Sequence, residues 1–552
     1  MSLVELEVFS HHFSVTVHSR EIQTSLMRYI SQNLTQWDMV YDKAERRNKL
    51  VPKAVYAKRD KHNRFRFHIN SLQDVKDYLA LLTQSSPIKP TRHLYNPRNI
   101  VRCKFPHNPD LIKTPRDYQE PVIEYITKEN PVCKLVELSM GLGKTFCTIE
   151  AMRKLEMRTA VLLQPKYFSR WYNGTREDIE ELQDDAILEG ASQEEIDKIK
   201  IVGLGEDIEL EEGDVFLVSG EGKLRTLLQN IKSPLNPNGD LNPKVIIFST
   251  VTLQNWFKNY ATLTAEQWAS ADFGCMPYDL YEHLGVGFLA IDEKHESFHF
   301  MFIHDLYTNV PYSVAMSGTM ISDDAFKGRM MNLMHPQTDR YKDIGTDAYI
   351  TTMSLHYRFN EPDRINYTRK GTSQYNHINF EQSIMKRKGV SNNYYSMIKR
   401  FIDKKFFDKE RYEEGDKGIV YCASIQMCTE LSDYLKSKYD NIDIRKYTGG
   451  DKASDLYDPV IRVSTPGAAG TAIDIPGLTF NLNTVAIKET AKNRQITGRL
   501  RELKKREKPI SPIYATLVND DNHKHRSFHK QRLEKLGDLS KSHRIVEETN
   551  LI

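Results

Sequence analysis

Short apolar runs alternate with stretches of helical periodicity along most of the chain. Up to about residue 340, the runs lie at 133–138, 160–163, 245–248, 286–291 and 312–316. A second series lies at 418–422, 442–447, 460–464, 484–487 and 513–518, with a helical pattern at 426–438. Apolar runs of this length are typical of parallel strands that helices cover on both faces. The pattern therefore predicts an α/β fold with two tandem lobes.

The beginning of the chain follows a different pattern. Apolar and polar residues alternate at 3–17 and 64–69, and helical periodicity occurs at 22–34 and 72–82. This mixture predicts a small α+β domain over residues 1–100. Three prolines between 87 and 97 indicate a linker at its end.

Changes in polarity place the remaining boundaries. The first lobe is expected at 101–345, with a strongly acidic surface insertion near 176–214. Polar residues with weak helical character at 346–410 predict a helical connector. The second lobe is expected at 411–535, followed by a polar, frayed tail at 536–552.

Composition excludes a membrane protein. Among 552 residues, 39% are hydrophobic, and no apolar run approaches the roughly 20 residues of a membrane span. The first residues lack the zones of a signal peptide, so we expect a cytoplasmic protein, in the host cytoplasm if the source is viral. The six cysteines lack a zinc-ligand spacing, and a net charge of +3 neither requires nor excludes a polyanionic partner.

A glycine-rich turn follows the first apolar run. Residues 135–145 end in Met140-Gly141-Leu142-Gly143-Lys144-Thr145 and pass from a predicted strand into a predicted helix. In such a turn the backbone N–H groups and the helix N-terminus point at phosphates. Lys144 would bind the β and γ phosphates of ATP, and the Thr145 hydroxyl would ligate Mg²⁺. Position 138 is Leu where the general motif has Gly.

Two acids end the run at 286–291. Asp292 and Glu293 are followed by Lys294 and His295. In a phosphate-binding fold, the first acid would hold Mg²⁺ and the second would act as general base on the attacking water.

From about residue 112 onward, the order of these motifs resembles that of superfamily 2 helicases and translocases. Arg116 and Gln119 resemble the element that binds adenine, and the loop at 140–145 is similar to that of Swi/Snf-type motors. The resemblance implies two tandem RecA-like P-loop lobes, with ATP and Mg²⁺ as cofactors.

The resemblance also assigns residues that contact nucleic acid or transmit the ATP state. In the first lobe, strand contacts are implied for Gln164, Pro165, Lys166, Ser249 and Thr250, and coupling for Ser317, Gly318 and Thr319. In the second lobe, Thr465 would contact nucleic acid, and Gly470, Asp474 and Gln495 would lie at the nucleotide. Arg499 and Arg501 resemble the catalytic arginines. They are two positions apart where the family has three, so which of them is the arginine finger stays open.

Among superfamily 2 motors, phage UvsW-type branch-migration helicases share the plan of a small first domain, two lobes and a carboxy-terminal stretch. Residues 41–68 hold ten Lys and Arg residues interleaved with Tyr56 and Phe65, a composition that fits a duplex backbone. We therefore expect a DNA helicase or translocase acting on duplex or branched DNA, without a membrane partner. An RNA helicase and a nucleic-acid-stimulated ATPase switch are the alternatives. A protein partner could bind the N-terminal domain or the acidic insertion.

Overall fold

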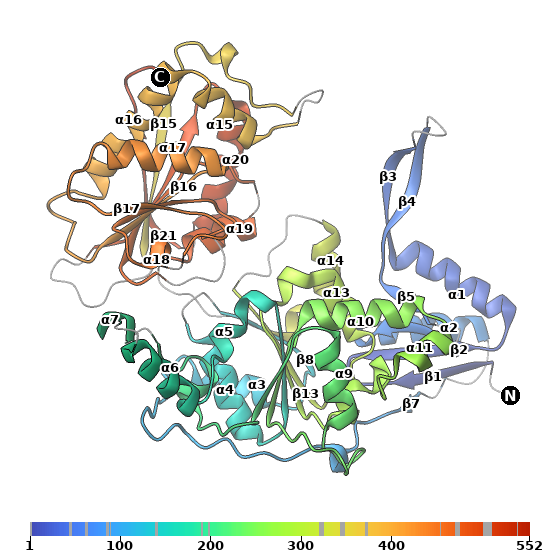
Figure 1. Ribbon diagram of the computed structural model, residues 1–552. Coiled ribbons are helices and arrows are strands. Elements are labelled where there is room, and N and C mark those ends of the chain that lie inside the picture. The colour runs from blue at the N-terminus through green and yellow to red at the C-terminus, as the bar shows by residue number, and fades with distance from the viewer. Residues whose placement is uncertain are drawn as a thin grey trace. The chain divides into compact units, whose positions relative to one another are not determined.

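Each of two units is built around a seven-stranded parallel sheet (Figure 1). Unit 1 comprises Met1–Met320 and Asp324–Lys342, and unit 2 comprises Ile321–Asp323 and Asp343–Ile552. The computed structural model describes residues 3–42, 47–60, 64–83, 88, 90–138, 142–188, 191, 193–196, 199–318, 325–342, 348–369, 374–452, 454–469, 475–488, 490–500, 510–537 and 539–552. The predicted α/β fold with a small N-terminal α+β domain is confirmed.

The sheet of unit 1 has the strand order β10-β11-β9-β12-β13-β8-β14. Its strands are β8 (Cys133–Glu137), β9 (Thr159–Leu163), β10 (Val215–Val218), β11 (Val245–Ser249), β12 (Phe288–Ile291), β13 (Tyr312–Ser317) and β14 (Arg340–Lys342). The central strands β9, β11 and β12 are buried along their whole length, which explains their uninterrupted apolar sequences. Strand β13 lies between β8 and β12, so the two strands that precede the glycine-rich turn and the acid pair are separated by one strand.

Helices cover both faces of this sheet, with α3 and α4 on one face and α9 and α10 on the other (Figure 1). The longer helices are α3 (Glu120–Thr127), α4 (Lys144–Leu155), α6 (Arg176–Leu188), α9 (Glu221–Asn230), α10 (Thr250–Thr262), α11 (Ala265–Ala271), α13 (Phe298–Asp305) and α14 (Ala325–Met334). Four-residue helices are α5 (Phe168–Trp171), α7 (Gln193–Ile196), α8 (Leu204–Asp207) and α12 (Leu280–His283). Helices α6, α7 and α8 occupy the acidic segment near 176–214, and most described side chains of α6 are exposed.

The N-terminal part of unit 1 combines a five-stranded mixed sheet with two helices. It contains β1 (Val4–Val8), β2 (His12–Val17), α1 (Arg20–Asn33), β3 (Thr35–Asp42), β4 (Arg47–Val55), β5 (Ala57–Arg59), β6 (Phe65–His68), α2 (Leu72–Thr83) and β7 (Thr91–Arg92). Strands β3 and β4 form a separate two-stranded sheet, which extends away from the rest of the unit (Figure 1).

The N-terminal part shares its core with the seven-stranded sheet. One hydrophobic cluster extends from Val4 to Met334. Across this junction, His11 Nε2 lies 2.8 Å from Ser313 Oγ, and Asn70 Nδ2 donates to Leu333 O at 2.9 Å. A buried apolar cluster and hydrogen bonds therefore join the two parts into one body.

Unit 2 has the strand order β17-β18-β16-β19-β20-β15-β21. Its strands are β15 (Ile350–Tyr357), β16 (Lys417–Tyr421), β17 (Ile444–Tyr447), β18 (Ile461–Ser464), β19 (Leu478–Asn483), β20 (Ile513–Asn519) and β21 (Ser540–Glu547). Its helices are α15 (His377–Met385), α16 (Lys388–Lys405), α17 (Ile425–Lys436), α18 (Ser454–Tyr457), α19 (Thr490–Thr497) and α20 (His523–Leu536).

Three segments of unit 2 differ from the sequence-based expectation. Residues 346–410, expected as a helical connector, contribute β15 to the sheet as well as α15 and α16. The strand expected at 484–487 lies earlier, as β19, and the expected tail at 536–552 contains the edge strand β21. The polar side chains of β15 and β21 satisfy one another, since Thr352 Oγ1 lies 2.9 Å from Ser540 Oγ and 3.0 Å from His543 Nδ1.

In the part of the chain that the structure describes, no helix is both long and apolar enough to cross a membrane.

Candidate functional site

The candidate catalytic residues of unit 1 meet at one edge of its sheet. Lys144 begins α4 after β8, Asp292 follows β12, and Ser317 ends β13. The carboxyl ends of parallel strands lie at the same edge of a sheet, where open α/β folds bind their ligands. The topology thus brings Lys144 and Ser317, which are 173 positions apart in sequence, to the same edge of the sheet.

The end of the glycine-rich turn is held by Gln119. Gly143 has a left-handed φ of +81°, and a Cβ at this position would lie 2.4 Å from Gln119 Nε2. Gln119 Nε2 donates to Leu142 O at 3.0 Å, and Gln119 Oε1 accepts from Arg116 N at 3.0 Å. Glycine is therefore favoured at 143 by its left-handed backbone angle, and a larger residue would also displace the Gln119 amide from Leu142 O. Ser139, Met140 and Gly141 lie outside the described residues.

Lys144 forms a nearly buried ion pair with the second acid. Its Nζ lies 3.1 Å from Glu293 Oε1, and the side chains are 11% and 6% exposed. Burial is the largest influence on Glu293 and opposes its ionisation. The charges of Lys144, His295 and Arg170 and the hydrogen bond from Lys144 together outweigh burial and hold the pKa of Glu293 below its usual value. Burial, and then the charge of Glu293, raise the pKa of Asp292. Asp292 Oδ2 accepts a hydrogen bond from Trp171 Nε1 at 2.9 Å.

His295 connects the acid pair to the end of β13. His295 Nδ1 lies 2.8 Å from Ser317 Oγ and 3.4 Å from Glu293 Oε2. Glu293 has a left-handed φ of +46°, so the chain turns sharply between Asp292 and His295. A change at Glu293 can therefore reach the Ser317-Gly318 segment through one side chain. Thr319 lies outside the described residues.

The residues at this edge fit Mg²⁺ and a nucleotide phosphate. Magnesium in proteins is bound by one or two carboxylates together with substrate phosphates, and the Asp292 carboxylate and Thr145 hydroxyl offer such oxygen donors. Among the described atoms, Glu293 Oε2 is buried without a hydrogen-bond partner. Lys144, at the N-terminus of α4, supplies the cation that a phosphate requires.

The strand-contact candidates of unit 1 lie at the same sheet edge, after β9 and β11. Pro165 and Ser249 line one cavity of about 280 Å³ together with Gly220. Gln164 Nε2 donates to Ser297 Oγ, and Lys166 Nζ forms an ion pair with Glu296 at 2.9 Å. Thr250 is buried at the first position of α10. Pro165 and Ser249 therefore share one cavity, whereas Gln164 and Lys166 contact the segment after the acid pair.

The candidates of unit 2 are only partly described. Thr465 Oγ1 accepts a hydrogen bond from Ala468 N at 3.2 Å, after β18. Arg499 is buried near Tyr421. Burial raises the pKa of Tyr421, and the positive charge of Arg499 opposes this rise. Residues Gly470, Asp474 and Arg501 and the side chain of Gln495 lie outside the described part of the chain.

Part of the expected basic patch is buried. Tyr56 and Phe65 belong to the core, and Arg66 is buried with its Nε 3.2 Å from Asp60 Oδ2. Because they are buried, these residues do not form a nucleic-acid surface. All four residues of β6 are buried, which the alternation of apolar and polar residues in the sequence does not reveal. Lys43 and Arg46 lie outside the described residues, and Lys53 on β4 is exposed.

Sequence reasoning missed one partner of the acid pair and one ion pair of the residue that follows it. Trp171 is fully buried, and its Nε1 donates a hydrogen bond to Asp292. Lys294 Nζ lies 2.8 Å from Asp305 Oδ2, and His68 Nε2 of the N-terminal part lies 3.6 Å from the same oxygen. No local spacing signals contacts between residues so far apart in sequence.

No protein-family model matches the chain, and no curated protein matches it. Among similar solved structures, Dbp5 of S. cerevisiae bound to RNA and ADP BeF3 is 13% identical; 79% of this chain and 90% of that chain are covered, with a TM-score of 0.41. UvsW of T4 is 11% identical; 99% of this chain and 100% of UvsW are covered, with a TM-score of 0.30. The ATP-dependent Type ISP restriction-modification enzyme LlaBIII bound to DNA is 12% identical, with 79% and 32% covered and a TM-score of 0.46.

Similarities at this level do not determine what the chain does. Its strand orders and parallel connections define the fold itself, two tandem RecA-like lobes with a small N-terminal α+β domain.

Proposed function

We propose that this chain is an ATP-hydrolysing motor of superfamily 2 that acts on duplex or branched DNA. The observation that carries the proposal is the Lys144–Glu293 pair beside Asp292, at the carboxyl edge of a parallel sheet. A phosphate-binding lysine, a magnesium-binding acid and a general base are the groups that phosphoryl transfer to water requires.

In the proposed mechanism Lys144 exchanges the Glu293 carboxylate for phosphate oxygens. Glu293, which is ionised in the ion pair, is then free to accept a proton from the attacking water, and loss of the Lys144 charge raises its proton affinity. Asp292 and Thr145 would hold Mg²⁺, which neutralises charge on the phosphates when bound. Arg499 or Arg501 would add a cation at the leaving phosphates. His295 would transmit the change at Glu293 to Ser317.

The hairpin of β3 and β4 favours DNA over RNA in this proposal. It is a free-standing two-stranded ribbon whose sequence contains Arg47, Lys49 and Lys53. The major groove of B-form DNA admits a two-stranded ribbon, whereas that of A-form RNA is too narrow and deep. Basic side chains on such a ribbon would contact phosphates without reading the sequence.

The ATPase rate with different nucleic acids tests the proposal. Rates are measured at one stated salt concentration with single-stranded DNA, duplex, fork, four-way junction and RNA. We expect the strongest stimulation by duplex or branched DNA, and its loss in Lys144→Ala. Stimulation by RNA alone would identify an RNA motor instead, and steady hydrolysis without strand or triplex displacement would identify a switch.

A further inference from the structure

The segment 294–313 links two parts of the proposed ATP site, and the N-terminal part of unit 1 holds it. The segment begins next to Glu293, continues through α13 and ends in β13, the strand that ends at Ser317. Side chains of β2, of β6 and of His11, which precedes β2, contact it. A change in the position of this segment would therefore move both the acid pair and β13.

Asp305 connects Lys294 to His68 of the N-terminal part. Asp305 Oδ2 lies 2.8 Å from Lys294 Nζ and 3.6 Å from His68 Nε2, and each of the three side chains is at most 2% exposed. His68 Nδ1 accepts a hydrogen bond from Asn70 N, so the ring proton is on Nε2 and faces Asp305. Burial opposes ionisation of Asp305, but the charge of Lys294 and the hydrogen bonds from His304 and His68 hold its pKa well below the usual value.

The other end of the segment has a second link to the N-terminal part. His11 Nε2 lies 2.8 Å from Ser313 Oγ, and both side chains are buried. Ser313 donates its one hydroxyl proton to Val132 O at 2.7 Å, so it accepts from His11. Between the two links, His12 Nδ1 lies 3.2 Å from the carbonyl oxygen of Thr308. Contacts from the N-terminal part are therefore distributed along the segment from α13 to β13.

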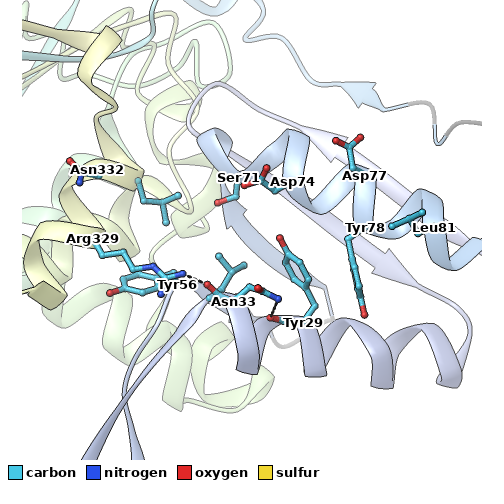
Figure 2. Close-up of a pocket in the computed structure, with 12 residues that line it drawn as sticks. Tyr29, Asn33, Tyr56, Ser71, Asp74, Asp77, Tyr78, Leu81, Arg329 and Asn332 are labelled. Atoms are coloured by element: carbon cyan, nitrogen blue, oxygen red, sulfur yellow. Dashed lines mark hydrogen bonds between the residues drawn. The ribbon is translucent and has the colours of Figure 1, made fainter.

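The N-terminal part packs more openly against α14. A cavity of about 730 Å³ lies there, lined by Tyr29 of α1 and Tyr78 of α2 on one side and by Arg329 and Asn332 of α14 on the other (Figure 2). The buried imidazoles of the N-terminal part, at positions 11, 12 and 68, contact the segment 294–313 instead. Close polar contact is therefore directed at the segment that adjoins the acid pair.

The backbone of Glu293 requires a restraint from its neighbours. Its φ of +46° lies in the left-handed region, which is unfavourable for a residue with a Cβ. Such conformations persist only where the surrounding structure fixes them. Lys294 is the next residue, and its buried ion pair with Asp305 fixes the chain directly after Glu293. The restraint on Glu293 therefore depends on where Asp305 lies.

The polar contacts at the segment contribute position more than stability. The N-terminal part already shares an apolar cluster with the first sheet. A buried ion pair adds little net stability, because taking two charges out of water costs about as much free energy as their attraction returns. Hydrogen bonds and ion pairs nevertheless restrict distance and direction, which apolar contacts do not.

We propose that the N-terminal part positions the ATP site, with His68 holding Glu293 through Asp305 and Lys294, and His11 holding β13 through Ser313. His68 is a positioning residue, because its contacts reach Glu293 only through the two intervening side chains. This inference rests on the proposed ATPase and gives the N-terminal part a role in hydrolysis besides binding nucleic acid.

ATP hydrolysis by the full chain with forked DNA tests the role of His68. His68→Leu removes the N–H that faces Asp305, so we expect kcat to fall about tenfold, as for other residues that orient a catalytic group. Affinity for a fluorescent ATP analogue should stay unchanged, because Lys144 and the glycine-rich turn are not part of this network. His68→Gln retains an N–H donor and should keep most of the kcat.

Two further variants separate positioning from folding. Leu79 is fully buried in α2, and Leu79→Ala should lower the unfolding temperature while kcat, measured where the variant is folded, stays unchanged. Ser313→Ala removes the contact with His11 without adding bulk, and it should lower kcat with analogue affinity unchanged. Ser313→Ala also tests the proposal if His68→Leu does not fold.

Three outcomes would overturn the inference while leaving the proposed ATPase intact. They are an unchanged kcat in both His68→Leu and Ser313→Ala, an equal fall of kcat in Leu79→Ala, and an equal fall of kcat in His68→Gln and His68→Leu. Absence of hydrolysis by the unaltered protein would overturn the proposed function and this inference with it, so the two failures are distinguishable.

Discussion

At the scale of single residues, Trp171 favours the ionised state of Asp292. Its indole N–H donates to Asp292 Oδ2 at 2.9 Å, while burial and Glu293 raise the pKa of that carboxyl. Trp171→Phe removes the donor and keeps an aromatic ring, so the pKa of Asp292 should rise further and a larger fraction should be protonated at a given pH. We expect the Mg²⁺ concentration for half-maximal ATPase to rise about threefold to tenfold, more at pH 6 than at pH 8.

Trp256→Phe is the matched control for that prediction. Trp256 is similarly buried, but in the described structure its Nε1 has no hydrogen-bond partner. Its replacement removes a similar volume without touching Asp292. Equal Mg²⁺ dependence in the two variants would show that the Trp171 bond has no role in Mg²⁺ binding.

His11 makes stability depend on pH. It is fully buried, and burial lowers its pKa from 6.5 to about 3. The unfolded chain therefore binds a proton at this position as pH falls below 6.5, whereas the folded chain does not until about pH 3. Folding stability is lost across this interval by up to about 1.4 kcal/mol per pH unit for such a group. His11→Gln should make the urea-unfolding midpoint depend less on pH between 6.5 and 5.

The unaltered protein provides the comparison. If the urea-unfolding midpoint of His11→Gln depends on pH between 6.5 and 5 as steeply as that of the unaltered protein, protonation of His11 does not limit folding.

At the scale of elements, a buried ion pair joins the acid-pair segment to α13. Lys294 Nζ and Asp305 Oδ2 lie 2.8 Å apart, with side chains 2% and 1% exposed. Asp305→Asn leaves a buried lysine without its counterion, which destabilises proteins by about 3 to 5 kcal/mol. We expect this loss in the urea-unfolding free energy, together with reduced ATPase, because Lys294 adjoins Glu293.

The double variant Lys294→Met/Asp305→Asn tests the cause. Replacing both charges leaves no buried ion, so most of the lost stability should return. An additive loss in the double variant would mean that packing, not charge, explains the single variant.

The hairpin of β3 and β4 gives a second prediction at this scale. Lys49 and Lys53 lie on β4, and two phosphate contacts would change the slope of log affinity against log salt by about 1.8. Lys49→Gln/Lys53→Gln should reduce the slope for duplex DNA by that amount, uniformly across sequences. Lys232 is an exposed lysine that precedes β11, so it lies at the amino edge of the first sheet. Lys232→Gln should not change the salt slope. An unchanged slope in the hairpin variant would remove the hairpin from the DNA contact.

Some strands could be predicted from the sequence and others could not. The difference lies in whether the strand carries polar side chains that form hydrogen bonds to neighbouring strands. Strands β8, β9, β11 and β12 are covered by helices and have apolar sequences, so their positions follow from the pattern. Strand β15 is just as buried, but it contains Thr351, Thr352 and Ser354, whose hydroxyls can bond to neighbouring strands. A polar strand whose partners lie about 190 residues away cannot be distinguished from a loop by its own sequence.

The same reasoning applies to the site at the scale of the whole molecule. The glycine-rich turn and the acid pair are local patterns, and the fold brings them together as expected for parallel strands. The contacts of Trp171 with Asp292 and of His68 with Asp305 depend on how separate segments pack, and they have no local signature. The shared core of the N-terminal part and the first sheet was missed for this reason.

This division of the core predicts how the chain can be cut. A hydrophobic cluster of unit 1 draws only on described residues between 4 and 334, and two clusters of unit 2 draw only on described residues between 350 and 552. Residues 1–342 and 343–552 should therefore each fold and unfold cooperatively when expressed alone. Residues 101–342 should not, because the removed part carries Tyr56, which packs edge-on against Phe302 with ring centroids 6.0 Å apart.

Although each unit should fold alone, stimulated ATP hydrolysis should require both units. The 1–342 fragment retains Lys144, Asp292 and Glu293, so it should bind a fluorescent ATP analogue, and Lys144→Ala in the same fragment should abolish this binding. It lacks the arginines of unit 2, so ATPase stimulated by nucleic acid should fall by a factor of about 10³ or more, the usual effect of losing a catalytic arginine. Full stimulated hydrolysis by 1–342 would show that unit 2 supplies no catalytic group, and it would reduce the proposed two-lobed motor to a one-lobed ATPase.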